Sequence, residues 1–227
     1  MLNFIFGSFG ISKNDETDII KLLERQKDFK KLSKFEKSQA LCIQISSELA
    51  KKGKGALIVV GNTKSYKTLF PNFFRNNNTS IFQKGMEKVL MQLAELDGAL
   101  VISEDGIVKA YGAMLTKSST FKGAGTRHSA AKGISAEKNI VAILASEEDK
   151  LVRIFKNASL SAEINPHTKN VENHVSKVVR FVNTPEGAVA AGAAIAIPFL
   201  GIPGVVVFAG SYYVVRNILK LAKGRHS

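Results

Sequence analysis

The hydrophobic positions follow a helical spacing early in the chain and then change to short continuous runs. A capping-box pair, Ser33 and Glu36, precedes apolar residues four apart, which predicts an amphipathic helix over about 34–53. Acidic residues before an apolar stretch predict an earlier helix over about 19–31. The glycine-bounded run 55–61 (GALIVVG) is rich in β-branched residues and predicts a buried strand.

Helices and strands continue to alternate through the middle of the chain. Thr79 or Ser80 is suited to cap a helix whose apolar face ends at Leu96. The further predicted elements are strands at 97–102 and 107–115 joined by a hairpin turn, a short helix capped by Thr126, and strands at 140–144 and 151–155. This order predicts the α/β class, with a mixed central β-sheet flanked by helices over 35–165 and an N-terminal helical segment at 1–34.

The last part of the chain changes in composition. We expect a linker at 166–185, followed by a hydrophobic helical hairpin with a basic tail at 186–227. Residues 187–215 carry no charge, and two prolines divide them into halves shorter than the roughly twenty residues of a membrane helix. Basic residues on both sides favour a hairpin that contacts a membrane from the cytoplasmic face. A hairpin buried in an oligomer interface is the alternative.

The charge balance narrows the partners without choosing one. Thirty-two Lys and Arg against nineteen Asp and Glu give a formal net charge of +13, which attracts polyanions in general. The sequence has neither zinc-finger spacing nor an aromatic RNA-recognition signature, so nucleic acid is not the expected partner. The single cysteine, Cys42, cannot form an internal disulfide, which favours the cytoplasm. The stretch 61–65 (GNTKS) is not a P-loop, because a P-loop has a glycine directly before its lysine and Thr63 stands there.

Three polar segments stand where apolar runs begin or end, at 97–99, 125–128 and 146–148. In the second, a helix N-terminus offers unpaired N–H groups to a phosphate, Thr126 adds a hydroxyl and Arg127 adds a forked cation. In the first, Asp97 is suited to hold a divalent ion and accept a proton, while Gly98 leaves room for a flat base or a ribose. Taken singly, the segments are more typical of a turn, a structural histidine and a solvated surface.

The order and spacing of the segments change that interpretation. Asp97-Gly98-Ala99, Gly125-Thr126-Arg127-His128 and Ser146-Glu147-Glu148 together resemble the diadenylate cyclase domain, over roughly residues 35–160. Members of that family condense two ATP molecules into cyclic di-AMP. The resemblance therefore implies a nucleotidyltransferase with ATP as substrate and Mg²⁺ or Mn²⁺ as cofactor.

The resemblance also implies roles for single residues. Asp97, Arg127 and His128 would be catalytic, with Asp97 and Glu148 at the metal and Asp97 helping to activate a ribose 3′-hydroxyl. The ATP-binding residues would be Gly98, Ala99, Met114, Leu115, Gly125, Thr126, Arg127, His128 and Ser146. Each domain would supply half of the reaction centre, so self-association is needed to bring two ATP-loaded copies face to face.

One position departs from the family pattern. The second motif usually reads Arg-His-Arg, whereas Ser129 takes the third place here. A missing charge-assisted hydrogen bond costs roughly 1.5–3 kcal/mol unless another cation, such as Lys122 or Lys132, compensates. The sequence thus favours a membrane-associated diadenylate cyclase and leaves a non-catalytic ATP- or dinucleotide-binding module at a membrane as the alternative.

Overall fold

The computed structural model describes residues 19–69, 79–121, 125–184, 194–198 and 202–210. The strands in these ranges are β1 (Ala56–Val60), β2 (Tyr66–Thr68), β3 (Ala99–Ile102), β4 (Val108–Leu115), β5 (Val141–Ala145), β6 (Val152–Lys156), β7 (Ser159–Ile164), β8 (Ala194–Pro198) and β9 (Val205–Gly210). The helices are α1 (Ile19–Glu24), α2 (Lys34–Lys51), α3 (Met86–Glu95), α4 (Thr126–Ile134) and α5 (Val175–Asn183), with 3₁₀ turns η2 (Phe29–Lys31) and η3 (Val171–His174).

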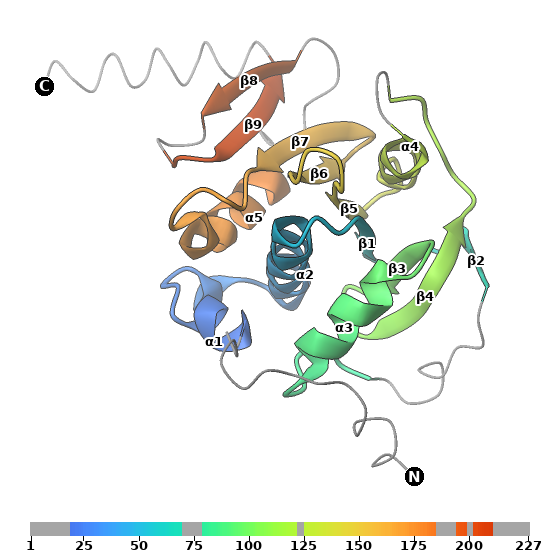
Figure 1. The fold of residues 1–227 in the computed structure, drawn as a ribbon, viewed down its shortest axis with the longest axis horizontal. Coiled ribbons are helices and arrows are strands. Elements are labelled where there is room, and N and C mark those ends of the chain that lie inside the picture. The colour runs from blue at the N-terminus through green and yellow to red at the C-terminus, as the bar shows by residue number, and fades with distance from the viewer. Residues whose placement is uncertain (1–18, 70–78, 122–124, 185–193, 199–201, 211–227) are drawn as a thin grey trace, which may run out of the picture.

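The strands form one mixed sheet (Figure 1). Their order across the sheet is β2-β4-β3-β1-β5-β6-β7-β9-β8. β1 and β3 are parallel, whereas the other neighbouring strands are antiparallel. The predicted α/β class with a mixed central sheet is confirmed.

Helices cover both faces of the sheet. Alternate residues of β1 point to opposite sides, so that Ile58 joins the cluster formed with α1, α2, α3 and α5, while Leu57 and Val59 join the cluster formed with α4. Every residue of β1 is buried. A strand covered on both faces has no solvent side, and this is why its sequence is a continuous apolar run.

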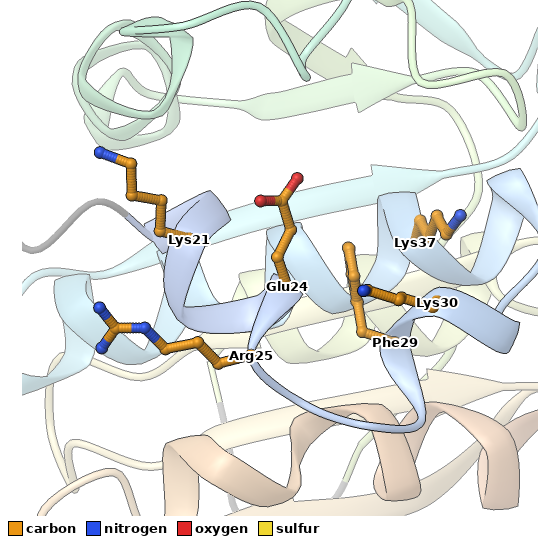
Figure 2. A pocket seen from close by; sticks show the side chains of 6 residues that line it. All are labelled: Lys21, Glu24, Arg25, Phe29, Lys30 and Lys37. Carbon is orange, nitrogen blue, oxygen red and sulfur yellow. The ribbon is translucent and has the colours of Figure 1, made fainter.

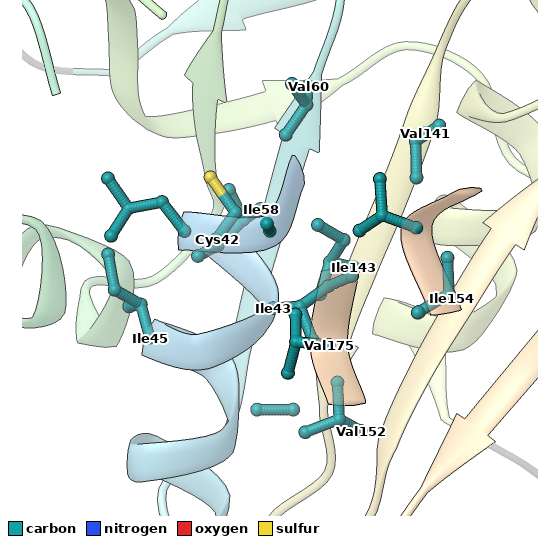
Figure 3. Packing of buried hydrophobic residues seen from close by; sticks show 14 of the residues in the cluster. Cys42, Ile43, Ile45, Ile58, Val60, Val141, Ile143, Val152, Ile154 and Val175 are labelled. Atoms are coloured by element: carbon teal, nitrogen blue, oxygen red, sulfur yellow. The ribbon is translucent and has the colours of Figure 1, made fainter. Parts of the chain in front are cut away.

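Helix α2 lies at the centre of the larger cluster. Its capping box is formed as predicted, because the Ser33 N–H donates to Glu36 Oε2 at 2.8 Å and the Glu36 N–H donates to Ser33 Oγ at 3.3 Å. Figure 3 shows Ile43 of α2 among side chains of the sheet and of α5. Burial raises the pKa of the Cys42 thiol far above its usual range, so this residue acts as a small apolar side chain of the core.

The early helix and α3 differ from the predictions in where they begin and end. The early helix divides into α1 and η2, both packed on the α2 cluster through buried residues such as Leu23 and Phe29. Helix α3 begins at Met86, after Gly85 with a φ of +83°, and not near residue 80. Ser80 pairs with Ile107 in an isolated β-bridge, which holds that part of the chain extended and delays the helix.

The packed core extends past residue 165. The sequence predicts a linker at 166–185, whereas the structure has η3 and α5 there, preceded by β7. One face of α5 is buried against the α2 side of the sheet through the residues Val175, Val178, Val179 and Val182. Their spacing of three and four positions is a helical apolar stripe, which packs α5 beside α2.

The C-terminal hairpin is made of strands where the structure describes it. β8 pairs with β9, and β9 continues the sheet from β7. The predicted helical hairpin is therefore wrong for 194–198 and 205–210, and most of the remainder of 186–227 lies outside the described residues. A short apolar run fits either structure by its period, but adjacent valines favour a strand and β7 offers an edge to pair with. None of the helices in the described ranges is long and apolar enough to cross a membrane.

Candidate functional site

The strand register brings the three polar segments to one end of the sheet. β1 and β3 start side by side, with Leu57 opposite Ala99. β4 and β5 end at the same place, because Ala99 pairs with Ala113 and Ala56 pairs with Ala145. We call this end, together with the start of α4, the polar edge; it holds segments 97–99, 125–128 and 146–148.

Gly98 packs its backbone against β4. Its φ is +101°, and a Cβ atom there would lie 2.6 Å from the carbonyl carbon of Gly112 and 2.8 Å from the nitrogen of Ala113. The next residue, Ala99, is buried as the first residue of β3. The space that a side chain of Gly98 would need is thus filled by protein backbone, so room for a base or a ribose is not what requires glycine here.

Arg127 connects the two layers of the polar edge. It extends from α4 until its Nη2 lies 3.8 Å from the Asp97 Oδ1, next to β3. The Asp97 side chain is fully exposed and that of Arg127 is 37% exposed, so water screens this pair and it contributes little to stability. The guanidinium also lies over Gly55, where a Cβ would be 2.5 Å from Arg127 Nη1 and 3.4 Å from the Cβ of Glu147. Both partners of this pair remain accessible to a ligand.

Helix α4 starts at the polar edge. Gly125 is its N-cap and an added Cβ there would meet no atom within 4 Å, while Thr126 is the first helical residue and is exposed. The sequence predicts Thr126 as the cap, one position later than the structure has it. The Ser129 carbonyl accepts a bond from the Ser119 N–H at 2.8 Å, and Lys132 Nζ donates to the Thr120 carbonyl at 3.0 Å. Lys132 is thus bonded to the preceding loop, and Lys122 lies outside the described residues.

His128 lies inside the protein, unlike its neighbour Arg127. It is only 8% exposed, and its ring stacks on Phe121 with 5.7 Å between centroids and an interplanar angle of 15°. Burial lowers the pKa of His128, and the positive charge of Arg153 lowers it further, against the opposing effect of Asp149 and Glu148. The neutral imidazole is therefore favoured in the folded state.

Arg153 is a residue of this region that the sequence interpretation missed. It lies on β6 with a side chain that is 14% exposed, and its Nη1 is 3.0 Å from His128 Nε2. Its Nε donates to Glu163 Oε2 at 2.9 Å, and its Nη2 contacts the Asp149 carboxylate. The signal for it in the sequence is an arginine between two apolar residues, Val152 and Ile154, within a predicted strand, where a charge that is not fully exposed needs a partner.

The turn after β5 supports the same network. Ser146 is buried, and its N–H donates to the Leu151 carbonyl at 2.9 Å, which closes the turn between β5 and β6. Burial acts to raise the pKa of Asp149, but hydrogen bonds from Arg153 and Ser146 outweigh it and lower the pKa. Glu147 and Glu148 are exposed at the start of the turn.

The predicted adenine border and metal ligands are at the surface. Met114 is 54% exposed and Leu115 is partly buried at the end of β4. Within the described ranges, no group of three or more His, Cys, Asp or Glu side chains is placed to hold a metal ion. Mg²⁺ is commonly bound by one or two carboxylates together with substrate phosphates, and the exposed Asp97 and Glu148 fit that kind of shared site better than a closed protein cage.

A separate hollow lies on the α2 side of the sheet, away from α4. Its volume is about 560 Å³, and it is lined by Lys21, Glu24, Arg25, Phe29, Lys30 and Lys37 (Figure 2). Lys37 Nζ is 5.9 Å from the centroid of the Phe29 ring. None of the predicted site residues lines this hollow.

Comparisons with known proteins agree on one family. A family model described as "DisA bacterial checkpoint controller nucleotide-binding" (DAC) matches residues 36–160. A protein named diadenylate cyclase from Methanocaldococcus jannaschii is 31% identical over 136 residues, which are 55% of this chain and 44% of that protein. One of the same name from Haloferax volcanii is 35% identical over 136 residues, 54% of this chain and 51% of that protein. The chain thus spans about half the length of these curated relatives.

A solved structure, that of DacA from Staphylococcus aureus, is also similar. It matches at 21% sequence identity and a TM-score of 0.45, over 65% of this chain and 94% of that one. The family match runs from the first turn of α2 to the start of β7, which includes the whole polar edge and Arg153.

The two glycines of the polar edge are expected to respond differently to alanine. Gly98→Ala should lower the free energy of unfolding by about 2 kcal/mol or more, because backbone atoms of β4 cannot move aside and the positive φ is strained. Gly55→Ala meets the movable end of the Arg127 side chain, and its contact with Glu147 at 3.4 Å is an ordinary one, so it should cost no more than about 0.5 kcal/mol. Urea denaturation of both variants measures this difference, and equal losses would contradict it.

His128 should make stability depend on pH. Its pKa is lowered on folding from the usual 6.5, so below pH 6.5 the unfolded chain binds more protons than the folded protein and the free energy of unfolding falls as the pH falls. His128→Gln lacks this group and should lose less stability between pH 7.5 and pH 5.5 when both proteins are denatured with urea. The same loss in both proteins would show that His128 is not the group responsible.

Proposed function

We propose that this chain, which belongs to the family of DisA bacterial checkpoint controller nucleotide-binding (DAC) domains, condenses two ATP molecules into cyclic di-AMP and two pyrophosphates. The observation that carries the proposal is the meeting of Asp97, just before β3, and Arg127 of α4, which lie 3.8 Å apart at the polar edge. An accessible carboxylate can accept the proton of a hydroxyl while an accessible guanidinium beside it binds a phosphate.

Asp97 has the chemistry of a proton acceptor. Its exposed carboxylate would take the proton of a ribose 3′-hydroxyl as that oxygen attacks the α-phosphate of the second ATP. When ATP is bound, Arg127 would exchange Asp97 for phosphate oxygens, to which its fork can bond in a bidentate way. This exchange would leave the Asp97 carboxylate available for the hydroxyl.

The start of α4 would bind the triphosphate. Gly125 and Thr126 leave the first N–H groups of the helix open to the polar edge, and Thr126 adds a hydroxyl. Gly98 and Ala99 would contact the nucleoside through their backbone, and Met114 and Leu115 would border the adenine. Ser146 would act through the turn that it closes, near the phosphates.

Mg²⁺ or Mn²⁺ would be held by Asp97, with Glu148 nearby, together with substrate phosphates. When bound, the ion would offset the negative charge of the phosphates and help to orient them. Asp97 would then have two tasks, and its replacement would affect both.

Two copies of the chain would be needed for one turnover. Each polar edge has one Asp97 and one α4 N-terminus, whereas cyclic di-AMP requires two attacking hydroxyls and two α-phosphates in line with them. Asp97, Met114 and Thr126 are exposed, which leaves them free to face a second copy. Self-association through the polar edge therefore belongs to the proposal.

Asp97→Asn should reduce cyclic di-AMP formation at least about a hundredfold, because an amide cannot accept the proton. The assay is ATP turnover with Mn²⁺ or Mg²⁺ over a range of protein concentrations, with the product measured by mass spectrometry. Asp105→Asn, at an exposed turn at the other end of β3, is the matched control and should keep full activity. If ATP stabilises the wild type against heat but no product forms, the result would instead support the non-catalytic binding module. The observation in favour of that alternative is the serine at position 129, where the family usually has an arginine.

Contact between 187–215 and a membrane is also proposed, on the uncharged stretch and its basic flanks. The full chain should float with vesicles of phosphatidylglycerol and phosphatidylcholine, whereas a chain that ends at Thr184 should stay at the bottom of the gradient. Circular dichroism checks that the shortened chain is folded. Equal flotation of the two chains, or none of either, would refute the membrane contact.

A further inference from the structure

The contact between Arg153 and His128 determines which ring nitrogen of the histidine carries the proton. A guanidinium has donors only, and Arg153 Nη1 lies 3.0 Å from His128 Nε2. Nε2 must therefore accept, so the imidazole is neutral and its proton is on Nδ1. A protonated imidazole would place two donors and two positive charges against each other.

The orientation of the His128 ring is fixed as well. Phe121 stacks on one face of the ring at 5.7 Å between centroids. Phe121 in turn meets the fully buried Phe155 edge-on, with 5.5 Å between centroids and an angle of 81°. A ring that is stacked on one face and bonded at Nε2 has one remaining polar atom, Nδ1, which can donate one hydrogen bond.

The charge of Arg153 is already balanced by its neighbours. Asp149 from the turn and Glu163 from β7 both bond to the guanidinium, so the three side chains together carry one negative charge. A phosphate that approached Arg153 would be repelled by both of these carboxylates. Arg153 is therefore not a replacement for the arginine that is missing at Ser129.

We infer that Arg153 is a positioning residue, which acts by holding His128 as the Nδ1–H tautomer in one orientation at the start of α4. This inference rests on the proposed function, in which Gly125, Thr126 and Arg127 at the start of α4 bind ATP phosphates. His128 then works as a hydrogen-bond donor through Nδ1 and takes no part in proton transfer through Nε2.

The first test is nuclear magnetic resonance of the full chain labelled with ¹⁵N-histidine, which assigns the tautomer without any turnover. Wild-type His128 should show a protonated Nδ1 and an unprotonated Nε2 at pH 7.5. In Arg153→Met, which keeps an apolar stem but has no donor, this preference should be lost. A protonated Nε2 in the wild type would overturn the inference, whether or not the protein makes cyclic di-AMP.

The second test is kinetic. Arg153→Met should lower kcat roughly ten- to a hundredfold, the loss expected for a charge-assisted hydrogen bond, while the KM for ATP changes much less. Arg180→Met is the matched control, because Arg180 pairs with Asp28 at 3.2 Å on α5, away from the polar edge, and should keep both constants. A large rise in KM with an unchanged kcat would indicate that Arg153 binds phosphate, and would contradict the positioning role.

A pair of substitutions at His128 tests the same point independently of the stability of Arg153→Met. The amide of His128→Asn places a donor near the Nδ1 position, whereas that of His128→Gln places one near Nε2. The asparagine variant should keep at least several times more activity than the glutamine variant, and the reverse order would refute donation through Nδ1. If the wild type has the Nδ1–H tautomer but makes no product, the proposed function is refuted and the tautomer assignment stands.

Discussion

Burial of β1 from both faces is the constraint on which the rest of this structure depends. α2 covers one face and α4 the other, and β3 and β5 flank the strand on its two sides. A strand enclosed in this way cannot hold a polar side chain along its length. β3 and β5 are also buried along their whole lengths, so Asp97 and Ser146 stand just outside these strands. The register of β1 with its two neighbours collects the polar segments at one edge, beside the start of α4.

The polar edge combines two kinds of charged contact. Asp97 and Arg127 meet in water, where their attraction is weak and either partner can turn to a ligand. Asp149 and Glu163 bond to Arg153 where the guanidinium is mostly buried. Removing one partner would leave a buried charge unpaired and would destabilise the fold. The exposed pair is suited to bind substrate, and the buried group is suited to hold His128 still beside it.

Membership of the DAC family indicates that the polar edge binds a nucleotide. Ser129 stands where the family usually has an arginine, so one expected phosphate contact is missing. Lys132, the lysine nearest to Ser129 in sequence, is bonded to the carbonyl of Thr120, and Arg153, which contacts the adjacent His128, is bonded to two acids. The phosphates of a bound ATP would therefore depend on Arg127 and the backbone of α4 more than the family pattern implies.

The sequence by itself determined the elements whose signals are local. The capping box of Ser33 and Glu36 and the apolar run of β1 can each be recognised within a few residues, and the class of the fold follows from the alternation of helix and strand signals. The three polar segments are each local as well, and their order along the chain can be compared with a known family pattern. The tertiary structure alone decided the delayed start of α3, the strands β8 and β9, the packing of α5 and the contact of Arg153 with His128. Each of these depends on partners far apart in the chain, such as β9 pairing with β7 or the 25 positions between His128 and Arg153, and local patterns carry no information about such partners.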